Sequence, residues 1–561
     1  MFNLLVLALF AQGISCSTSG VSLSQGTYFA SAAIADLDQF LGIRYAQAPV
    51  GDLRLANPVA YNGSSTQQIN ATSYGPGCSQ NASYGIANGL SEDCLFLNIV
   101  RPASSSSNVT DLPVMFWVHG GGNVNGQGTF YNGTALVQHS VSIGQPVIYV
   151  GINYRLNGFG FMYSSVLKDA NVLNLGLKDQ YLALSWVHNN IRAFGGNPDK
   201  VTLFGESLGA WDCWSQMHYA AVKNESGKLF KGVITESGGP GGVAGTVVNA
   251  STGDTKFNGL LETVSCSNTT DQLACLRKVP YSTLNPLLEE YGSTYYEYSS
   301  LTIDDDWFDT DLVSLATSGS FAPIPMMHGS NLNEGSEFMS SMFDPPSRSD
   351  LYSTIYSYLG TNDSTIINSI LDTYENHTWF ENGLGYHADL TANASYYIAE
   401  AALGDLYMEI SRRVVLRTHC TKAPTWGYHF FQRPPAAILN FTYQYGPHTT
   451  AYAERAGVHH MTEIAYVFGD VMSVEGWTQG DANVAIYMMS AWISFANHQT
   501  PNKHGLSGYP TWDQFETNSR RVMYLQDQGN ETLTMMDDSL RLDIYEKYQS
   551  AMTKLGLSEL P

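Results

Sequence analysis

The amino-acid sequence predicts an α/β fold built on a large, mostly parallel, twisted sheet with helices on both faces. Two kinds of segment indicate this fold. Residues 113–118 and 146–150 are continuously apolar, which is typical of strands that are buried on both sides of a sheet. Residues 177–191 instead carry apolar side chains at intervals of 4, 3, 3 and 4, which lie on one face of a helix. Strands that alternate with helices in this way form parallel sheets.

A third strand is expected at residues 201–204, and the sequence after it carries a serine of special interest. The strand leads into Gly205-Glu206-Ser207-Leu208-Gly209 and then into a helical stretch. Gly-x-Ser-x-Gly between a strand and a helix is typical of a nucleophile elbow, a sharp turn that exposes the serine hydroxyl. The two glycines are expected because a Cβ there would collide with neighbouring backbone. Ser207 is therefore the candidate nucleophile, and an apolar run at residues 232–236 continues the sheet.

A serine hydroxyl attacks readily only when a base removes its proton, and that base needs an acid to orient it. In hydrolases with a nucleophile elbow, the chain order is serine, acid, histidine. Glu334 follows a short apolar strand that begins near residue 324, although it could also be an ordinary loop carboxylate. Two adjacent histidines, His459 and His460, come later in the chain. We expect His460 to be the base, with His459 as the alternative.

Backbone N–H groups that can stabilise a negatively charged oxygen are expected at two places. A substrate carbonyl develops this charge during acyl transfer, and preorganised donors lower its energy. Gly120, Gly121 and Gly122 follow the strand at residues 113–118, and Leu208 begins the helix after the candidate nucleophile. Glu206 has two interpretations, a buried carboxylate with a raised pKa or a group that faces a cation, and the sequence leaves both open.

The acidic and histidine-containing motifs do not indicate a metal. His459-His460-x-x-Glu463 differs from the His-Glu-x-x-His pattern of zinc peptidases. Asp304-Asp305-Asp306 is expected to be a solvated turn, with calcium binding as the second interpretation. We therefore expect no metal site and no cofactor.

Several other short motifs accompany the nucleophile turn. They are Glu92-Asp93-Cys94-Leu95-Phe96-Leu97-Asn98, His119-Gly120-Gly121-Gly122, Asn153-Tyr154-Arg155, Gly176-Leu177-Lys178-Asp179-Gln180, Phe194-Gly195-Gly196-Asn197-Pro198, Asn333-Glu334-Gly335 and Trp492-x-x-Phe495-Ala496. With these motifs the chain resembles the type-B carboxylesterase/lipase family, the α/β-hydrolases that include cholinesterases and fungal lipases. The resemblance extends from near residue 30 to beyond residue 510, and so covers nearly the whole chain.

The resemblance implies an α/β-hydrolase fold and a carboxylic-ester hydrolase in which Ser207 is the nucleophile, Glu334 the orienting acid and His460 the base. By the same resemblance Ser237 would steady the acid–base pair. Independently of the resemblance, we expect Glu206 to lie beside the catalytic residues without contacting the substrate. The spacing of the cysteines alone leaves fifteen pairings open. The resemblance also implies three oxyanion donors and two disulfides: Gly121, Gly122 and Leu208, and Cys78–Cys94 and Cys266–Cys275.

Three departures from the family pattern bear on the substrate. Leu208 stands where a small residue is usual, and its isobutyl group is expected to narrow the pocket or stiffen the helix start. Asn123 stands where an apolar residue usually follows the glycines, so we expect a more polar pocket wall. The loop between Cys78 and Cys94 has fifteen intervening residues and no tryptophan, unlike the loops of cholinesterases and of the family's lipases. This short polar loop predicts an open pocket mouth and small or soluble ester substrates.

Length, composition and charge limit the classes of partner. The 561 residues are 44% hydrophobic and 14% charged, which is typical of an ordered globular protein. The net charge is −23 and no lysine- or arginine-rich run occurs, which argues against nucleic acid or anionic membrane surfaces. No repeat or disordered linker divides the chain. We expect a single domain over residues 17–561, with insertions that form the substrate pocket, and leave its oligomeric state open.

Residues 1–16 are typical of a secretory signal peptide. Their apolar run from Leu4 to Ala11 is too short to span a bilayer and is followed by small residues. Thirteen Asn-x-Ser/Thr sequons agree with export and glycosylation. Among the cysteines left outside the disulfides, Cys213 is expected to be buried as a small apolar residue, and Cys420 has no evident local partner. We expect a secreted glycoprotein without a stable membrane anchor.

The sequence therefore predicts a secreted serine hydrolase that acts on small carboxylic esters through an acyl-enzyme. A lipase or sterol esterase, and an aryl esterase of the feruloyl type, are alternatives in the same class. A binding protein that has lost catalysis on the same fold is the alternative from another class. The presence of a serine, an acid and a histidine in the required order counts against it.

Overall fold

The computed structural model describes residues 16–31, 34–81, 88–103, 110–242, 247–293, 301–339, 345–376, 394–438, 456–528, 532–557 and 560–561. Residues 1–15 of the predicted signal peptide lie outside these ranges, and Cys16 is the first residue of strand β1. Residues 82–87, in the loop between Cys78 and Cys94, also lie outside them.

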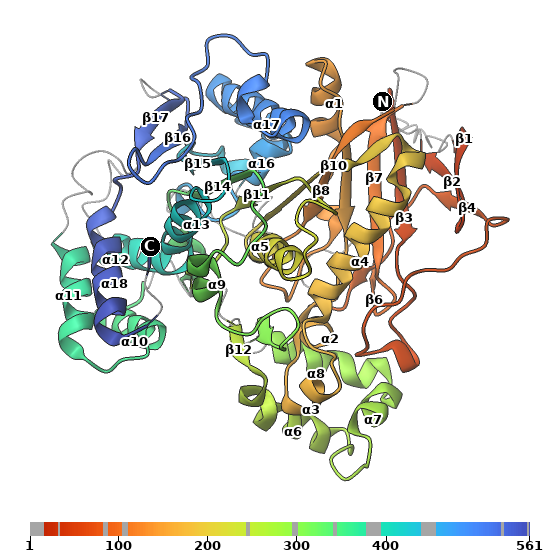
Figure 1. The fold of residues 1–561 in the computed structure, drawn as a ribbon, viewed down its shortest axis with the longest axis horizontal. Helices are drawn as coiled ribbons and strands as arrows, with labels where there is room; N and C mark the ends of the chain where they lie inside the picture. The colour runs from red at the N-terminus through yellow and green to blue at the C-terminus, as the bar shows by residue number, and fades with distance from the viewer. Residues whose placement is uncertain are drawn as a thin grey trace, which may run out of the picture.

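The described residues form a 13-stranded sheet in the order β1-β2-β3-β7-β9-β8-β10-β11-β14-β15-β16-β17, with β4 paired to β2 (Figure 1). All pairings from β9 through β16 are parallel, and the antiparallel strands lie towards the two edges. The strands are β1 (Cys16–Leu23), β2 (Gly26–Ser31), β3 (Leu37–Arg44), β4 (Gln68–Ala71), β7 (Phe96–Pro102), β8 (Leu112–Val118), β9 (Ile148–Ile152), β10 (Gly196–Glu206), β11 (Gly232–Glu236), β14 (Met326–Asn331), β15 (Thr425–Phe430), β16 (Arg521–Leu525) and β17 (Thr534–Asp537).

Two small sheets and a set of helices complete the fold. The small sheets pair β5 (Gly77–Cys78) with β6 (Leu90–Ser91) and β12 (Val247–Asn249) with β13 (Leu301–Ile303). The helices are α1 (Thr134–Ser142), α2 (Asn157–Phe161), α3 (Ser165–Asp169), α4 (Leu175–Asn190), α5 (Leu208–Val222), α6 (Asp254–Thr263), α7 (Gln272–Lys278), α8 (Tyr281–Ser293), α9 (Leu312–Ser318), α10 (Arg348–Leu359), α11 (Ser364–Glu375), α12 (Ala394–Gly404), α13 (Ile410–His419), α16 (Ile464–Val467), α17 (Gln479–His498) and α18 (Leu542–Leu555).

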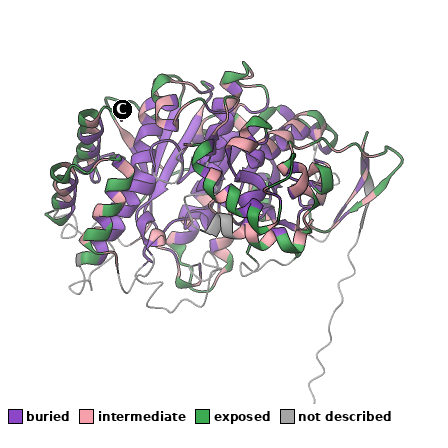
Figure 2. Ribbon diagram, turned by 90° about the horizontal axis from the view of Figure 1, so that it is seen from below, coloured by how far each residue is buried: buried purple, intermediate pink, exposed green. Residues whose placement is uncertain are grey.

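Two layers of the hydrophobic core pack on the sheet, one on each face, and a third, smaller cluster joins α3, α6 and α7. Along β8, Val114 and Phe116 pack into one layer, whereas Met115 and Trp117 pack into the other. This alternation follows because successive side chains of a strand point to opposite faces. Helices α4 and α5 contribute to the first layer, and α1, α16 and α17 contribute to the second. Figure 2 shows that the central strands are buried between these helices.

The predicted α/β-hydrolase architecture is thus confirmed, and the strands and helices expected in residues 113–236 are present. Both disulfides that the resemblance implies are formed, Cys78–Cys94 and Cys266–Cys275. Cys213 and Cys420 are free cysteines, and Cys213 is buried on α5 as expected. Among the described residues, no helix combines the length and the apolar character that crossing a bilayer requires.

The parallel strands bring three sequence-distant segments to one edge of the sheet. Ser207 directly follows β10, Ser237 directly follows β11, and Glu334 lies just beyond β14. Their strands are neighbours in the order β10-β11-β14, so their carboxyl ends meet, as in other open α/β sheets. The segment that contains His460 joins the same edge through a bridge between Asn333 and His459.

Candidate active site

Ser207 occupies a strained turn between β10 and α5. Its backbone has φ 55° and ψ −132°, a conformation that non-glycine residues rarely adopt and that costs energy unless neighbouring contacts hold it. One such contact is the hydrogen bond that the Ser207 amide donates to the carbonyl oxygen of Glu236, at 2.9 Å. A Cβ on Gly205 or Gly209 would lie within 2.6 Å of the carbonyl oxygen of Val118, so only glycine allows β8 and the turn to approach this closely. The motif therefore folds as a nucleophile elbow.

Glu334 holds the imidazole of His460. His460 Nδ1 lies 2.6 Å from Glu334 Oε2 in a buried hydrogen bond. The other carboxylate oxygen of Glu334 accepts bonds from the amide of Asn331 and the hydroxyl of Ser237, both at 2.6 Å. The carboxylate is therefore fixed from three sides, and it fixes the ring orientation of His460 in turn. The structure places Ser237 where the sequence interpretation expects it, against the acid.

The second nitrogen of His460 faces Glu206, the residue that precedes Ser207. Nε2 lies 3.2 Å from Glu206 Oε1. Among the hydrogen bonds of the described residues, none joins Nε2 to the hydroxyl of Ser207. Such bonds are often long in ligand-free enzymes and shorten when substrate binds. His459 is engaged elsewhere, because its Nδ1 is hydrogen-bonded to Thr462 at 2.8 Å.

Three buried glutamates, Glu206, Glu334 and Glu463, interact electrostatically with His460. Burial lowers the pKa of His460, but the carboxylates of Glu206 and Glu334 outweigh burial and raise it above the ordinary value. Burial also raises the pKa of Glu206 well above its usual range, and His460 opposes this. Burial raises the pKa of Glu463 to about 7, and the charge of Glu334 adds to this shift. The glutamates therefore favour a proton on the histidine.

The glycine loop contains the backbone conformations that an oxyanion site needs. Gly121 has φ 99° and Gly122 has φ 66°, values that favour glycine, and a Cβ on Gly120 would lie 2.9 Å from Cβ of Ser207. The loop therefore passes directly against the nucleophile. Leu208 is the first residue of α5, where helix amides have no intrahelical acceptor. These are the expected positions of the donors.

The expectation of a more polar pocket wall at Asn123 is wrong. Its side chain is 0% exposed and points away from solvent, with Nδ2 3.4 Å from Asp212 Oδ1 on α5. The sequence interpretation also missed Asn331, which donates to both Glu334 and Glu463, and Phe338, whose ring centroid lies 5.3 Å from that of His460. Of Asn331 and Phe338, only Asn331 could have been recognised from the sequence, because it lies three residues before Glu334.

The start of the loop between Cys78 and Cys94 is buried and tied to the protein. Ser79 and Gln80 are 3% and 0% exposed, and the hydroxyl of Ser79 is hydrogen-bonded to Tyr281 at 2.9 Å. Gln80 both donates to and accepts from the backbone of Gly126, at 2.8 and 2.9 Å. Residues 82–87 lie outside the described ranges, so the open mouth remains a prediction.

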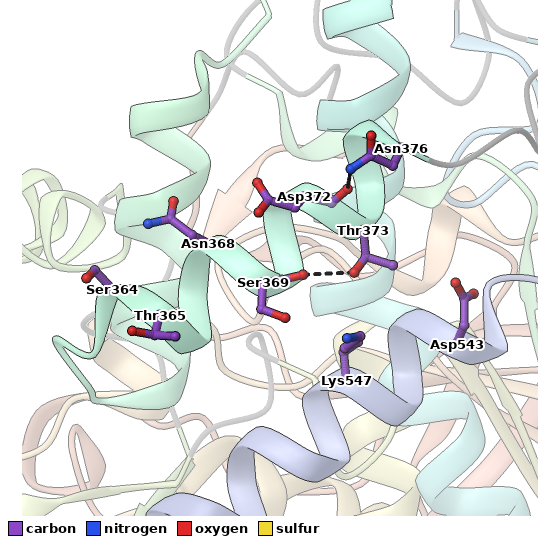
Figure 3. Close-up of a pocket in the computed structure, with 9 residues that line it drawn as sticks. All are labelled: Ser364, Thr365, Asn368, Ser369, Asp372, Thr373, Asn376, Asp543 and Lys547. Atoms are coloured by element: carbon purple, nitrogen blue, oxygen red, sulfur yellow. Dashed lines mark hydrogen bonds between the residues drawn. The ribbon is translucent and has the colours of Figure 1, made fainter.

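The acidic triplet Asp304-Asp305-Asp306 and a polar cavity lie apart from the proposed catalytic residues. Within the described ranges, no group of three or more His, Cys, Asp or Glu side chains is placed to hold a metal ion. Asp304 accepts the backbone amides of Asp306 and Trp307, so the acidic triplet begins a hydrogen-bonded turn. A polar cavity of about 780 Å³ lies between α11 and α18, away from the site (Figure 3). Its lining consists of Ser364, Thr365, Asn368, Ser369, Asp372, Thr373, Asn376, Asp543 and Lys547.

Similarity to known proteins shows the family to which the chain belongs. The profile of the Carboxylesterase family matches residues 22–544. Secreted lipase 1 of Botryotinia fuckeliana is 32% identical over 524 residues, which cover 87% of this chain and 85% of the relative. Carboxylesterase 1C of Mus musculus is 31% identical over 506 residues, which cover 85% and 83%. The solved structure of a thermophilic PNB esterase superposes with a TM-score of 0.75 at 25% identity, covering 95% of this chain and 100% of that one. The chain therefore belongs to the carboxylesterase family and is a carboxylic ester hydrolase.

Proposed function

We propose that the protein hydrolyses esters through an acyl-enzyme on Ser207. The observation that carries this proposal is the position of His460, held at 2.6 Å by Glu334 on one side and facing the residue before Ser207 on the other. Hydrogen bonds to a catalytic base often tighten only when substrate binds, so the proposal requires Nε2 and the serine hydroxyl to come together in the substrate complex. His460 then takes the serine proton as Oγ attacks the ester carbonyl.

The remaining steps use the same residues. The amides of Gly121, Gly122 and Leu208 stabilise the oxyanion of the tetrahedral intermediate. His460 delivers its proton to the leaving alcohol, and Glu334 balances the imidazolium charge. A water molecule, deprotonated by His460, then attacks the acyl-enzyme and releases the acid. As the second tetrahedral intermediate collapses, the bond between its central carbon and Oγ breaks and His460 returns its proton to Oγ, which restores the free enzyme.

For the substrate we propose small or soluble esters. Support comes from the short polar sequence between Cys78 and Cys94, and from Leu208, which stands where a small residue is usual and which we expect to narrow the pocket. A lipase is the second candidate, and the names of two similar proteins favour it, Secreted lipase 1 of Botryotinia fuckeliana and Lipase 5 of Diutina rugosa. We also propose that the protein is secreted, because residues 1–16 resemble a signal peptide and two disulfides suit an oxidising compartment.

The test is hydrolysis of p-nitrophenyl esters from acetate to palmitate by the wild type and by Ser207→Ala, with and without emulsified triglyceride. Activity that is greatest on short chains, is not raised by the emulsion and is lost in the variant would support the proposal in full. A preference for long chains at the emulsion surface would replace the substrate proposal by the lipase alternative. Unchanged turnover by Ser207→Ala would overturn the assigned nucleophile.

A further inference from the structure

Asn123 sits at a sharp bend directly after the proposed oxyanion glycines. Its backbone has φ 57°, a left-handed conformation that asparagine and aspartate tolerate better than other non-glycine residues. Its side chain is 0% exposed. A buried amide without partners is costly, so the contacts of this side chain decide where the loop can lie.

The contacts of Asn123 join the loop to neighbouring elements. Nδ2 donates to Asp212 Oδ1 at 3.4 Å, and Oδ1 accepts from the hydroxyl of Tyr154 at 3.3 Å. The backbone carbonyl of Asn123 accepts the amide of Asn157 at 2.7 Å. Asp212 lies in the second turn of α5, the helix that begins directly after Ser207, and it is 0% exposed. Its other oxygen accepts from Gln180 on α4 at 2.6 Å.

The proposed oxyanion donors lie on two separate elements. Gly121 and Gly122 belong to the loop after β8, whereas Leu208 begins α5. A shift of the loop relative to the helix would change the distance between these amides and the substrate oxygen, and misplacement of about 1 Å can cost about a hundredfold in rate. A contact between the loop and α5 would prevent that shift.

We propose that the hydrogen bond between Asn123 and Asp212 is a positioning contact. It keeps residues 120–123, here called the oxyanion loop, at a fixed distance from helix α5, which follows the nucleophile. The proposal rests on the proposed function, because it assumes that Gly121, Gly122 and Leu208 are the donors. Asn123 and Asp212 touch no substrate. They act through the backbone that they hold.

The charge of Asp212 supports this role. Burial raises the pKa of Asp212 to about 7, and the hydrogen bonds from Gln180 and Asn123 act in the opposite direction. The side-chain amides of Asn123 and Gln180 therefore both stabilise the carboxylate of Asp212. Removing one of them leaves the buried carboxylate with a single amide donor. A second carboxylate at position 123 would face Asp212 in a buried place, where like charges repel strongly.

The experiment compares Asn123→Asp with the double variant Asn123→Asp/Asp212→Asn. The single variant sets two carboxylates face to face, and we expect kcat to fall by about tenfold to a hundredfold with KM little changed. The double variant exchanges the two groups: an amide at position 212 donates to the carboxylate at position 123 and still accepts from Gln180. We expect its kcat to return to within about threefold of the wild-type value.

Asn174→Asp is the matched control. Asn174 is also buried and left-handed, with φ 52°, and its Nδ2 donates to an aspartate, Asp304, at 2.8 Å. The contact lies at the start of α4 and joins it to the segment after β13. This variant creates a charge conflict with a partly buried aspartate, away from the oxyanion loop. It should lower the melting temperature as Asn123→Asp does, and leave kcat unchanged.

A trifluoromethyl ketone, which forms a tetrahedral oxyanion on the serine, separates positioning from general destabilisation. Its inhibition constant should rise in Asn123→Asp in proportion to the loss of kcat, and recover in the double variant. Wild-type kcat and inhibition in Asn123→Asp, or a double variant as impaired as the single one, would overturn the proposal. So would an equal loss of kcat in Asn174→Asp.

Asn123→Leu provides the test if Asn123→Asp does not fold, because it removes the hydrogen bond without adding charge. The proposal then requires a lower kcat and weaker binding of the trifluoromethyl ketone at unchanged KM, and wild-type values would overturn it. Ser207→Ala identifies failure of the proposed function itself. If that variant keeps full activity, the nucleophile is wrong, whereas loss of activity in it with no effect at Asn123 rejects the positioning contact alone.

Discussion

Glu206 Oε1 lies 3.2 Å from Nε2 of His460, so the residue that precedes the nucleophile faces the nitrogen proposed to be the base. Neither carboxylate oxygen of Glu206 has a hydrogen-bond partner among the described residues, and the side chain is 0% exposed. In its ionised form the carboxylate therefore acts on the imidazole through its charge, whereas burial favours its protonated form. Both readings left open for Glu206 from sequence, a buried carboxylate and a group that faces a cation, apply to it.

Substitution of Glu206 by glutamine is expected to move the acidic limb of the pH profile. Glu206 raises the pKa of His460, and a base works only when it is unprotonated. Without the charge, His460 loses its proton at lower pH, so the limb of kcat/KM should shift to lower pH. The measurement is kcat/KM on a p-nitrophenyl ester across the acidic and neutral range.

Glu375→Gln is the control for this shift, because it removes a glutamate paired with Arg348 at the surface. It should leave the pH profile where it is. An acidic limb that stays in place in Glu206→Gln would mean that Glu206 is already uncharged in the working enzyme, which would contradict the expected effect.

Glu334→Gln is expected to lower kcat by about 10³-fold to 10⁴-fold, as loss of the orienting acid does in other serine hydrolases. The neutral side chain of glutamine cannot balance the positive charge of the imidazolium. Its NH₂ group can also face His460 Nδ1, where an acceptor oxygen is needed. Ser237→Ala removes one of the three donors to Glu334 and should cost about tenfold. Steady-state measurements of kcat check that Glu334→Gln is the more impaired of the two variants. A larger loss of kcat in Ser237→Ala would contradict the assigned roles.

Much of the fold and the site could be predicted because the signals are local. The strand before Ser207, its flanking glycines and the helix after it lie within residues 196–222 and fold as expected. Glu334 and His460 could be proposed because each lies in a short motif that resembles the family's, and the structure joins the two side chains at 2.6 Å. The carboxyl ends of parallel strands then meet by topology.

The remaining features depend on contacts between distant segments, which a sequence pattern does not contain. The side chain of Asn123 turns inward because Asp212, on another element, offers an acceptor there. Glu463 appears in the sequence only as a residue near the histidines, yet Asn331 and Ser237 both donate to it. Which way a polar side chain points is decided by partners that only the folded chain brings close.

Arg412 is expected to be essential for stability. It is 0% exposed and pairs with Glu409 at 2.9 Å and Asp538 at 2.6 Å, which joins α13 to the segment after β17. Arg412→Met would leave buried carboxylates without their main partner and should lower the free energy of unfolding by about 3–5 kcal/mol. Urea denaturation measures this. Arg192→Met is the control, because its pair with Asp199 is exposed and should cost less than about 1 kcal/mol.

The same ion pairs predict how stability depends on pH. Burial raises the pKa of Asp538, but Arg412 and Arg413 outweigh burial and hold it well below the ordinary value. A carboxyl whose pKa is lower in the folded state stabilises the fold at pH values above its unfolded pKa, near 4, and loses this contribution as the pH falls further. Urea unfolding at successively lower pH should therefore show a decline below about pH 4 that is smaller in Arg412→Met. An equal decline in both proteins would contradict the assignment to this pair.

The two disulfides should differ in their effect on activity although their effects on stability are similar. In the chain-entropy estimate, closing a loop of about 15 residues contributes about 3 kcal/mol, and a shorter loop contributes slightly less. The separations are 16 residues for Cys78–Cys94 and 9 for Cys266–Cys275. Replacing either pair by serines should therefore lower the melting temperature by a comparable amount.

Only the loss of Cys78–Cys94 should also lower kcat. Gln80, two residues after Cys78, is hydrogen-bonded in both directions to Gly126, which lies on the loop that follows the oxyanion glycines. Releasing Cys78 frees Gln80 and removes a second support of that loop, whereas Cys266–Cys275 lies between α6 and α7, with no such contact to the loop among the described residues. Melting curves and kcat of the two double-serine variants, measured below their melting temperatures, check this. Equal kcat in both variants would show that the disulfide supports the fold without supporting the oxyanion loop.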